Sequence, residues 1–136
     1  MNDIEEGSAL RIDFTKLAQV AARGCDVVPV AVQDADTGEV ILVAYANEQA
    51  LRHTIESGNA TFWSTSRNEL WEKGATSGET FAIVEIRVNC EQNSLLYVVR
   101  PRRGKICHTR NAAGNPRNCY YRRLDFATGE LVNLDP

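Results

Sequence analysis

The stretch that decides the fold is Val27-Val-Pro-Val-Ala-Val-Gln33, Asp34-Ala-Asp-Thr-Gly-Glu39 and Val40-Ile-Leu-Val-Ala-Tyr45. The two outer segments are rich in β-branched residues, and the middle segment supplies turn residues. This pattern predicts an antiparallel β-hairpin. Because proline has no backbone N–H, the first strand is either an edge strand or begins near Pro29. The segment Asp125-Phe-Ala-Thr-Gly-Glu130 repeats the turn pattern, which predicts the same turn a second time.

Two helices are predicted on either side of this hairpin. Residues 13–24 have Asp13 as a cap and Gly24 at the stop, with apolar positions at Phe14, Leu17, Val20 and Ala21. Residues 47–58 have Asn47 as a cap and Gly58 at the stop, with Ala50, Leu51 and Ile55 facing the core.

The other extended segments complete an α+β pattern. Strands are predicted over 61–67, 81–90, 95–99 and 119–124, while 70–80 is predicted to be a loop. The expected fold is α+β, with mostly antiparallel strands and two short helices. The 136 residues suffice for a single domain, 1–136, in which 1–12 form a loose leader.

Three cysteines and a histidine lie within thirty residues. Cys107 and His108 are in Lys105-Ile-Cys-His-Thr-Arg110, Cys119 is in Asn118-Cys-Tyr-Tyr-Arg-Arg123, and Cys90 precedes both. Three thiolates with an open fourth position are typical of a catalytic zinc site. The spacing lacks a paired CxxC motif, so it leaves a second interpretation, in which the thiols are ordinary buried apolar groups.

The cysteine stretch is also a basic island in an acidic chain. Residues 100–123 hold eight of the fifteen Lys and Arg residues and no acid, whereas the rest of the chain has eighteen acids and seven bases. Such a segment favours an anionic ligand, most simply a phosphate, or else it is a solvated basic loop. The pI of about 5.4 argues against nucleic acid as a partner.

The amino-acid composition indicates the cellular compartment in which the protein is expected. The N-terminal residues 1–6 are acidic and polar, so no secretory signal is expected, and no apolar run is long enough for a membrane. Four cysteines in such a chain indicate a reducing compartment, and the expected location is cytoplasmic.

Seven blocks of the chain carry a recognisable pattern, namely Val32–Val40, Ala44–Leu51, Trp63–Arg67, Leu70–Gly78, Val84–Cys90, Cys107–Thr109 and Cys119–Arg123. Together and in this order, these blocks resemble the phosphoribosyl-AMP cyclohydrolase family of histidine biosynthesis. The resemblance implies a zinc-dependent hydrolase that opens the adenine ring of phosphoribosyl-AMP between nitrogen 1 and carbon 6. It also implies a homodimer in which Cys90, Cys107 and Cys119 bind zinc and are drawn from both subunits.

The chain departs from the family pattern at the positions expected to bind metal and substrate. Where the resemblance implies three magnesium-binding aspartates, this chain has Asn89, Glu91 and Asn93, so any Mg²⁺ site is degraded. Glu79 replaces a histidine of the family, and the spacing between Cys107 and Cys119 is longer than usual. These changes leave two alternatives open, a zinc hydrolase for a different purine nucleotide and a non-catalytic zinc-binding relative.

The remaining candidate residues are a general base and a set of substrate-binding side chains. His108 adjoins Cys107, and histidine is the commonest general base, which makes His108 the candidate for that role, the alternative being a structural histidine that supports the metal site. The expected substrate is a phosphorylated purine nucleotide. Its candidate binding residues are Arg67, Lys73, Ser77, Glu79, Arg122 and Arg123.

Overall fold

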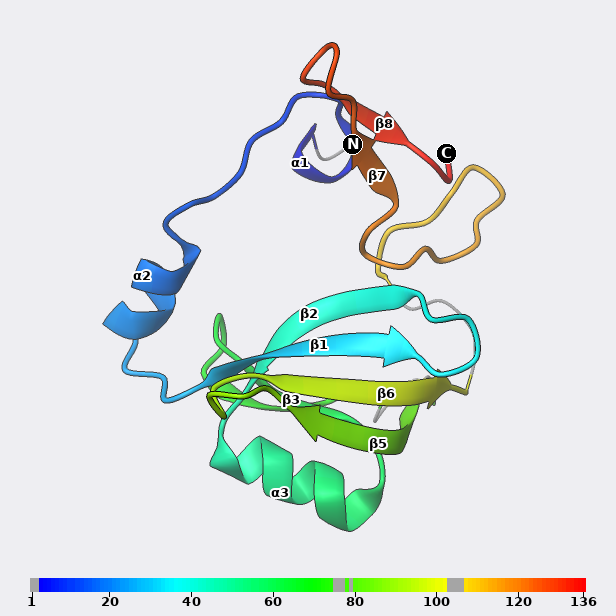
Figure 1. The fold of residues 1–136 in the computed structure, drawn as a ribbon. Coiled ribbons are helices and arrows are strands. Elements are labelled where there is room, and N and C mark those ends of the chain that lie inside the picture. The colour runs from blue at the N-terminus through cyan, green and yellow to red at the C-terminus, as the bar shows by residue number, and fades with distance from the viewer. Residues whose placement is uncertain (1–2, 75–77, 79, 103–106) are drawn as a thin grey trace.

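The computed structural model describes residues 3–74, 78, 80–102 and 107–136 (Figure 1). Its helices are α1 (Asp3–Glu6), α2 (Lys16–Ala22) and α3 (Glu48–Ser57). Its strands are β1 (Val28–Asp34), β2 (Val40–Ala46), β3 (Thr61–Ser64), β4 (Glu69–Glu72), β5 (Phe81–Val88), β6 (Leu95–Pro101), β7 (Arg122–Leu124) and β8 (Leu131–Asn133). The predicted α+β class is confirmed.

A four-stranded sheet in the order β2-β1-β6-β5 forms the body of the molecule. The predicted hairpin is present, with Val30 opposite Ala44, and β5 pairs with β6 in the same antiparallel sense. Only β1 and β6 run parallel, so the expectation of mostly antiparallel strands is confirmed for the described residues.

Pro29 does not mark an edge strand. β1 is an interior strand of the sheet, paired on one side with β2 and on the other with β6. Pairing with β6 starts at Val30, opposite Leu95, so the missing N–H of Pro29 falls just before that ladder. The alternative prediction, that Pro29 lies near the start of its strand, is the correct one.

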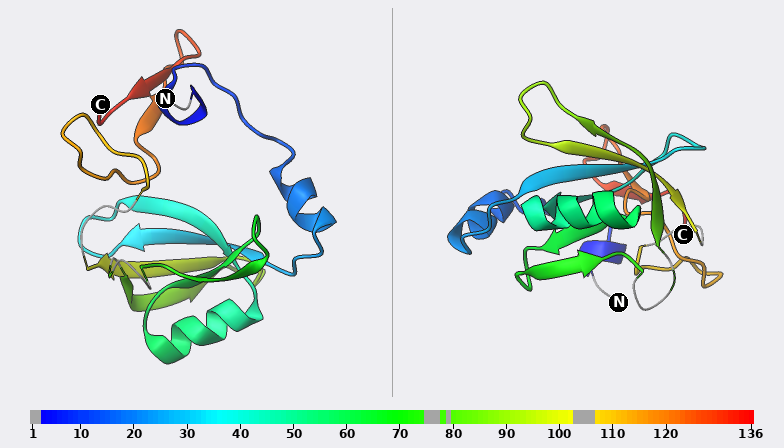
Figure 2. Two further views of the ribbon diagram at one scale, coloured as in Figure 1. Left: turned by 180° about the vertical axis from the view of Figure 1, so that it is seen from behind. Right: turned by 90° about the horizontal axis from the view of Figure 1, so that it is seen from below.

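One face of the sheet carries the core. Val30 and Val32 of β1 and Tyr97 of β6 are fully buried against Phe62 of β3. Helix α3 packs against β2, β3 and β4, and Figure 2 shows it beside the β3–β4 hairpin. The alternation of buried and exposed residues along β1 follows from the two-residue period of a strand.

Helix α3 ends as the sequence predicts, but its core face differs. The Asn47 side chain accepts a hydrogen bond from the N–H of Ala50, and Gly58 adopts the left-handed conformation at φ 73°. Leu51 packs against the core, but Ile55 is 64% exposed, so its predicted core position is wrong. Thr54 is buried instead, because its hydroxyl joins the helix to β3.

We expect Thr54→Val to destabilise the fold by about 1–3 kcal/mol. The Thr54 hydroxyl donates to the Ala50 carbonyl at 2.9 Å and accepts from the Thr61 N–H at 2.9 Å. Valine keeps the volume but leaves that buried N–H without its partner. Urea unfolding measures the change. Thr128→Val is the matched control: this exposed hydroxyl accepts from Glu130 N–H, and its loss is expected to cost less than about 0.5 kcal/mol. Equal effects at the two sites would contradict the role of Thr54.

The structure contains a third helix and two strands that the sequence does not predict. The additional helix is α1, and the additional strands are β4, which begins the predicted 70–80 loop, and β8. All three are short, at three or four residues, which is below the length at which a periodic pattern is recognisable.

The leader is attached rather than loose. The Ser8 carbonyl accepts from Leu131 N–H of β8, and Tyr121 donates its hydroxyl hydrogen to the Glu5 carbonyl. In Figure 1, α1 therefore lies with β7 and β8 on one side of the sheet. The chain then runs through α2 back to β1.

Helix α2 presents most of its apolar stripe to solvent. Its N-cap position is Thr15 rather than Asp13, although the Asp13 carboxylate accepts from the Thr15 N–H. Val20 is buried as predicted, but Phe14 is 91% and Leu17 is 69% exposed. No part of the chain that the structure describes covers the Phe14 and Leu17 side chains.

Candidate functional site

Two of the three cysteines meet at the base of the loop that joins β6 to β7. The Cys107 N–H donates to the Arg117 carbonyl at 2.6 Å, and the Cys119 N–H donates to the Ile41 carbonyl of β2 at 3.0 Å. These bonds close the loop and fix it against the sheet. The side chains of Cys107 and Cys119 are neighbours, close enough for Cys107 to raise the pKa of the Cys119 thiol, and Thr109 donates to the Cys107 sulfur at 3.1 Å.

The electrostatics of this pair fit a cation. Cys119 is exposed as a residue, but its sulfur is desolvated, and this burial together with the neighbouring Cys107 raises the pKa of Cys119 to about 12. The positive charge of Lys73 opposes the increase. Two adjacent thiols do not both ionise near neutral pH unless a cation shares them, and soft sulfur donors suit zinc.

Cys90 lies elsewhere in the same chain. It follows β5, which is one edge of the four-stranded sheet, whereas Cys119 is fixed to β2, which is the other edge. Three strand spacings of roughly 4.8 Å separate these edges, about 14 Å in all. A zinc–sulfur bond is about 2.3 Å long. Accordingly, the described residues contain no group of three His, Cys, Asp or Glu side chains that could hold a metal ion.

The degraded magnesium motif forms a closed hydrogen-bonded turn between β5 and β6. Asn89 donates its side-chain N–H to the Asn93 side-chain oxygen at 2.6 Å, and Asn93 donates to a Glu91 carboxylate oxygen at 3.2 Å. The Asn89 side-chain oxygen accepts from the N–H groups of Asn93 and Ser94. The side-chain oxygens of Asn89, Glu91 and Asn93, which a bound cation would need as ligands, therefore already accept hydrogen bonds from N–H groups of the same turn.

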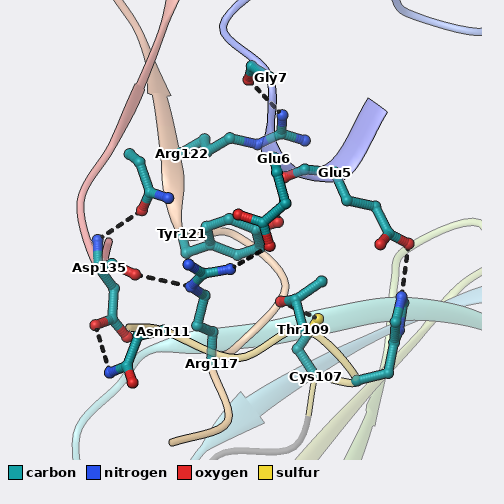
Figure 3. A network of polar contacts seen from close by, with 12 residues as sticks. Glu5, Glu6, Gly7, Cys107, Thr109, Asn111, Arg117, Tyr121, Arg122 and Asp135 are labelled. Atoms are coloured by element: carbon teal, nitrogen blue, oxygen red, sulfur yellow. Dashed lines mark hydrogen bonds and ion pairs between the residues drawn. The ribbon is translucent and has the colours of Figure 1, made fainter. Parts of the chain in front are cut away.

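His108 contacts the leader. Its Nε2 atom lies 2.6 Å from Oε1 of Glu5 in α1. Next to this pair, Arg117 is only 3% exposed and donates to Glu6 at 2.7 Å, and its guanidinium lies 4.4 Å from the centre of the Tyr121 ring. Figure 3 shows these side chains as one network between α1 and the segment that contains Cys107.

The predicted substrate residues are dispersed. Lys73 lies close enough to Cys119 to lower its pKa, whereas Arg67 pairs with Glu69 in the β3–β4 turn. Arg122 donates to the carbonyls of Ile4 and Gly7, so its guanidinium holds α1 in place. Arg123 is exposed on β7. Ser77 and Glu79 lie outside the described residues.

A cleft of about 280 Å³ opens beside Cys119. Its walls come from the leader and from the segment after the cysteine, with Ile4, Leu10, Tyr120, Arg122 and Leu131 among its lining residues. The leader thus borders the candidate site, which the sequence did not predict.

Glu5, Glu6 and Arg117 lie near the candidate site but were not predicted as site residues from the sequence. A signal was present, because the leader carries three acids in Asp3–Glu6 and the stretch 100–123 is free of acids. Complementary charge predicts that such segments associate. Part of the basic stretch therefore engages the chain's own carboxylates rather than an external anion.

Comparison with known proteins decides the family. Residues 42–121 match the sequence model described as phosphoribosyl-AMP cyclohydrolase. The chain belongs to the phosphoribosyl-AMP cyclohydrolase family. It is 46% identical over 112 residues to the phosphoribosyl-AMP cyclohydrolase of Haloarcula marismortui, covering 82% of this chain and 88% of that protein. The corresponding protein of Archaeoglobus fulgidus is 46% identical over 99 residues, which is 73% of this chain and 86% of its own length.

A longer relative is also similar. The histidine biosynthesis bifunctional protein HisIE of Aquifex aeolicus is 42% identical over 99 residues, and the match spans 46% of that protein. The matched family region contains Cys90, Cys107 and Cys119 but not α1. Among the described residues, no helix is long and apolar enough to span a membrane.

Proposed function

We propose that this phosphoribosyl-AMP cyclohydrolase family member opens the adenine ring of phosphoribosyl-AMP with zinc held between two subunits. The observation that carries the proposal is the separation of the cysteines. Cys107 and Cys119 are neighbours, and Cys90 follows the strand at the opposite edge of the sheet. A second copy can supply Cys90 to this pair and complete three ligands with an open fourth position. The four described cysteines are free thiols, which supports the proposed location in a reducing compartment, the cytoplasm.

The chain's own residues can meet the proton demands of the reaction. Hydrolysis forms a bond between the water oxygen and carbon 6 and breaks the bond from carbon 6 to nitrogen 1. The oxygen becomes an amide carbonyl, so the water gives up both of its protons. One proton moves to nitrogen 1, and the other is released to solvent as the ring, cationic because nitrogen 1 carries the phosphoribosyl group, loses its charge. When bound, zinc lowers the pKa of a coordinated water toward neutrality. His108 follows Cys107 directly and accepts the proton. Lys73, close to Cys119, offers a positive charge to the substrate phosphate.

The direct test is turnover of phosphoribosyl-AMP by the purified protein, with zinc content measured by elemental analysis. We expect ring opening and one zinc per subunit. AMP and other purine nucleotides are the comparison substrates. Turnover of one of these in place of phosphoribosyl-AMP would contradict the proposed substrate, and an active protein without zinc would contradict the proposed metal.

The exposed apolar residues near the N-terminus support a homodimer. Phe14 and Leu17 of the α2 segment are exposed, and Leu10 and Ile12 just before them are 45% and 58% exposed. These four exposed apolar side chains lie within eight residues, although Arg11, Asp13, Thr15 and Lys16 stand between them. A group of exposed large apolar side chains is typical of a surface that another protein covers. The occupant proposed is a second copy, because the separated cysteines require one.

We expect the double substitution Phe14→Ser and Leu17→Ser to weaken the dimer. Each change removes a large apolar group from the proposed interface, and each is expected to cost about 1–3 kcal/mol of association free energy. Sedimentation velocity over a concentration series measures the dimer dissociation constant. The control is Ile55→Ser, which alters an equally apolar side chain, 64% exposed, on α3. An unchanged dimer in the double variant would place the interface elsewhere.

A further inference from the structure

Glu5 is a carboxylate with a defined position. It belongs to α1, and its Oε1 atom lies 2.6 Å from Nε2 of His108, although 103 positions separate the two residues. Its backbone carbonyl accepts the Tyr121 hydroxyl, so both ends of the residue are engaged. Only 33% of the Glu5 side chain is exposed, which distinguishes it from a solvated surface acid.

The helix that carries Glu5 is anchored on both sides of it. Glu6 pairs with the buried guanidinium of Arg117 at 2.7 Å. Arg122 donates to the carbonyls of Ile4 and Gly7 at 2.7 Å and 3.0 Å. Figure 3 shows the Glu5 carboxylate pointing away from these anchors and toward the segment that contains Cys107. The anchors account for the position of α1 without any contribution from the Glu5 carboxylate, which leaves that group available for His108.

We propose that Glu5 is the positioning residue for His108, an inference that rests on the proposed function. A carboxylate can only accept, so at Nε2 it selects the imidazole tautomer with the proton on that atom. The lone pair is then on Nδ1, which can accept the proton of the attacking water. A carboxylate that fixes the tautomer and ring orientation of a histidine base is a recurrent arrangement in hydrolases.

The proton balance gives the carboxylate a second role. As the water oxygen bonds to carbon 6, its proton moves to Nδ1 and the imidazole becomes positively charged. The proton passes on to nitrogen 1 as the bond from carbon 6 to nitrogen 1 breaks, and the neutral imidazole returns. The second proton of the water leaves the oxygen for solvent as the carbonyl forms and the ring loses its positive charge. Glu5 stabilises the transient positive charge and is not itself protonated. Because Glu5 lies outside the matched region 42–121, this role is a feature of the leader.

The kinetic test uses Glu5→Ala, Glu5→Gln and the matched control Asp3→Ala, an exposed acid of the same helix. We expect Glu5→Ala to lower kcat about 10–100-fold with KM within about twofold. Glu5→Gln retains an acceptor for Nε2–H and is expected to recover part of this loss, and Asp3→Ala is expected to match the wild type.

A double-mutant cycle separates positioning from a general structural effect. In the His108→Ala background, Glu5→Ala is expected to change kcat by less than about twofold, because the group on which it acts is absent. A loss that persists in this background would overturn the proposal, as would equal turnover of Glu5→Ala and wild type. Absence of phosphoribosyl-AMP turnover in the wild type would instead overturn the proposed function.

A spectroscopic measurement does not depend on turnover. The chain has two histidines, so ring ¹⁵N spectra can be assigned by comparison with His53→Gln. At a pH where both imidazoles are neutral, we expect His108 to populate the Nε2–H tautomer, and Glu5→Ala to reduce that population while Asp3→Ala leaves it unchanged. Identical His108 spectra in wild type and Glu5→Ala would overturn the contact.

Discussion

A heterodimer of one Cys90→Ser subunit and one Cys119→Ser subunit is expected to retain about half of the wild-type activity, although each homodimer of these variants is inactive. In the heterodimer, the Cys107–Cys119 pair of the first subunit meets an intact Cys90 from the second. One complete site results, and the other site lacks two ligands. Serine is a poor replacement for a soft thiolate at zinc, so each homodimer has two defective sites.

The matched control combines Cys107→Ser with Cys119→Ser. These cysteines belong to the same pair, so each site of that heterodimer lacks one ligand and no activity is expected. Two affinity tags on the subunits allow the mixed dimers to be purified from co-expressing cells, and turnover and zinc content are then measured together. Recovery in the control, or none in the Cys90→Ser and Cys119→Ser pair, would contradict a site built from both subunits.

Millimolar magnesium is expected to change the ring-opening activity of the unmodified protein by less than about twofold. In the β5–β6 turn, the Asn89 amide occupies the Asn93 oxygen at 2.6 Å. The double substitution Asn89→Asp and Asn93→Asp removes the amide donors and adds two negative charges beside Glu91. We expect this variant to acquire an activity that rises about tenfold with magnesium, since the number of charged oxygens sets divalent affinity.

Magnesium binding can also be measured without turnover, from the melting temperature of the protein. Magnesium is expected to raise the melting temperature of the double variant and not that of the parent, because a ligand that binds only the native state stabilises it. Adding Glu91→Gln to the double variant serves as the control and should reduce both responses. If activity of the parent protein disappears on magnesium removal and returns on its addition, the substituted turn is not the magnesium site that governs the reaction.

The exposed stripe of α2 illustrates why a correct local pattern can give a wrong environment. The spacing of Phe14, Leu17 and Val20 predicts one apolar helical face, but α2 begins at Lys16, so only Leu17 and Val20 of these three lie in the helix. Sequence cannot tell whether an apolar face packs in its own chain or against another, because the physical driving force is the same. Here the structure buries Val20 and leaves Phe14 and Leu17 exposed.

The sequence alone determined the features that depend on neighbours a few residues away. The Asp34 and Asp125 turns form alike, each carboxylate accepting from the N–H two residues later. The α3 cap at Asn47 and the left-handed Gly58 are equally local. Such bonds are set by residue type at a fixed spacing, so the chain far away hardly affects them.

Only the tertiary structure decided which distant groups meet. It placed Pro29 in an interior strand, kept Cys90 apart from Cys119, and joined Glu5 to His108. These outcomes depend on the path of the whole chain, in which many loop closures of similar entropy compete and no local spacing selects among them. Complementary charge favours an association between the leader and the basic stretch, but the pairing of Glu5 with His108 and of Glu6 with Arg117 follows from how α1 docks beside Tyr121.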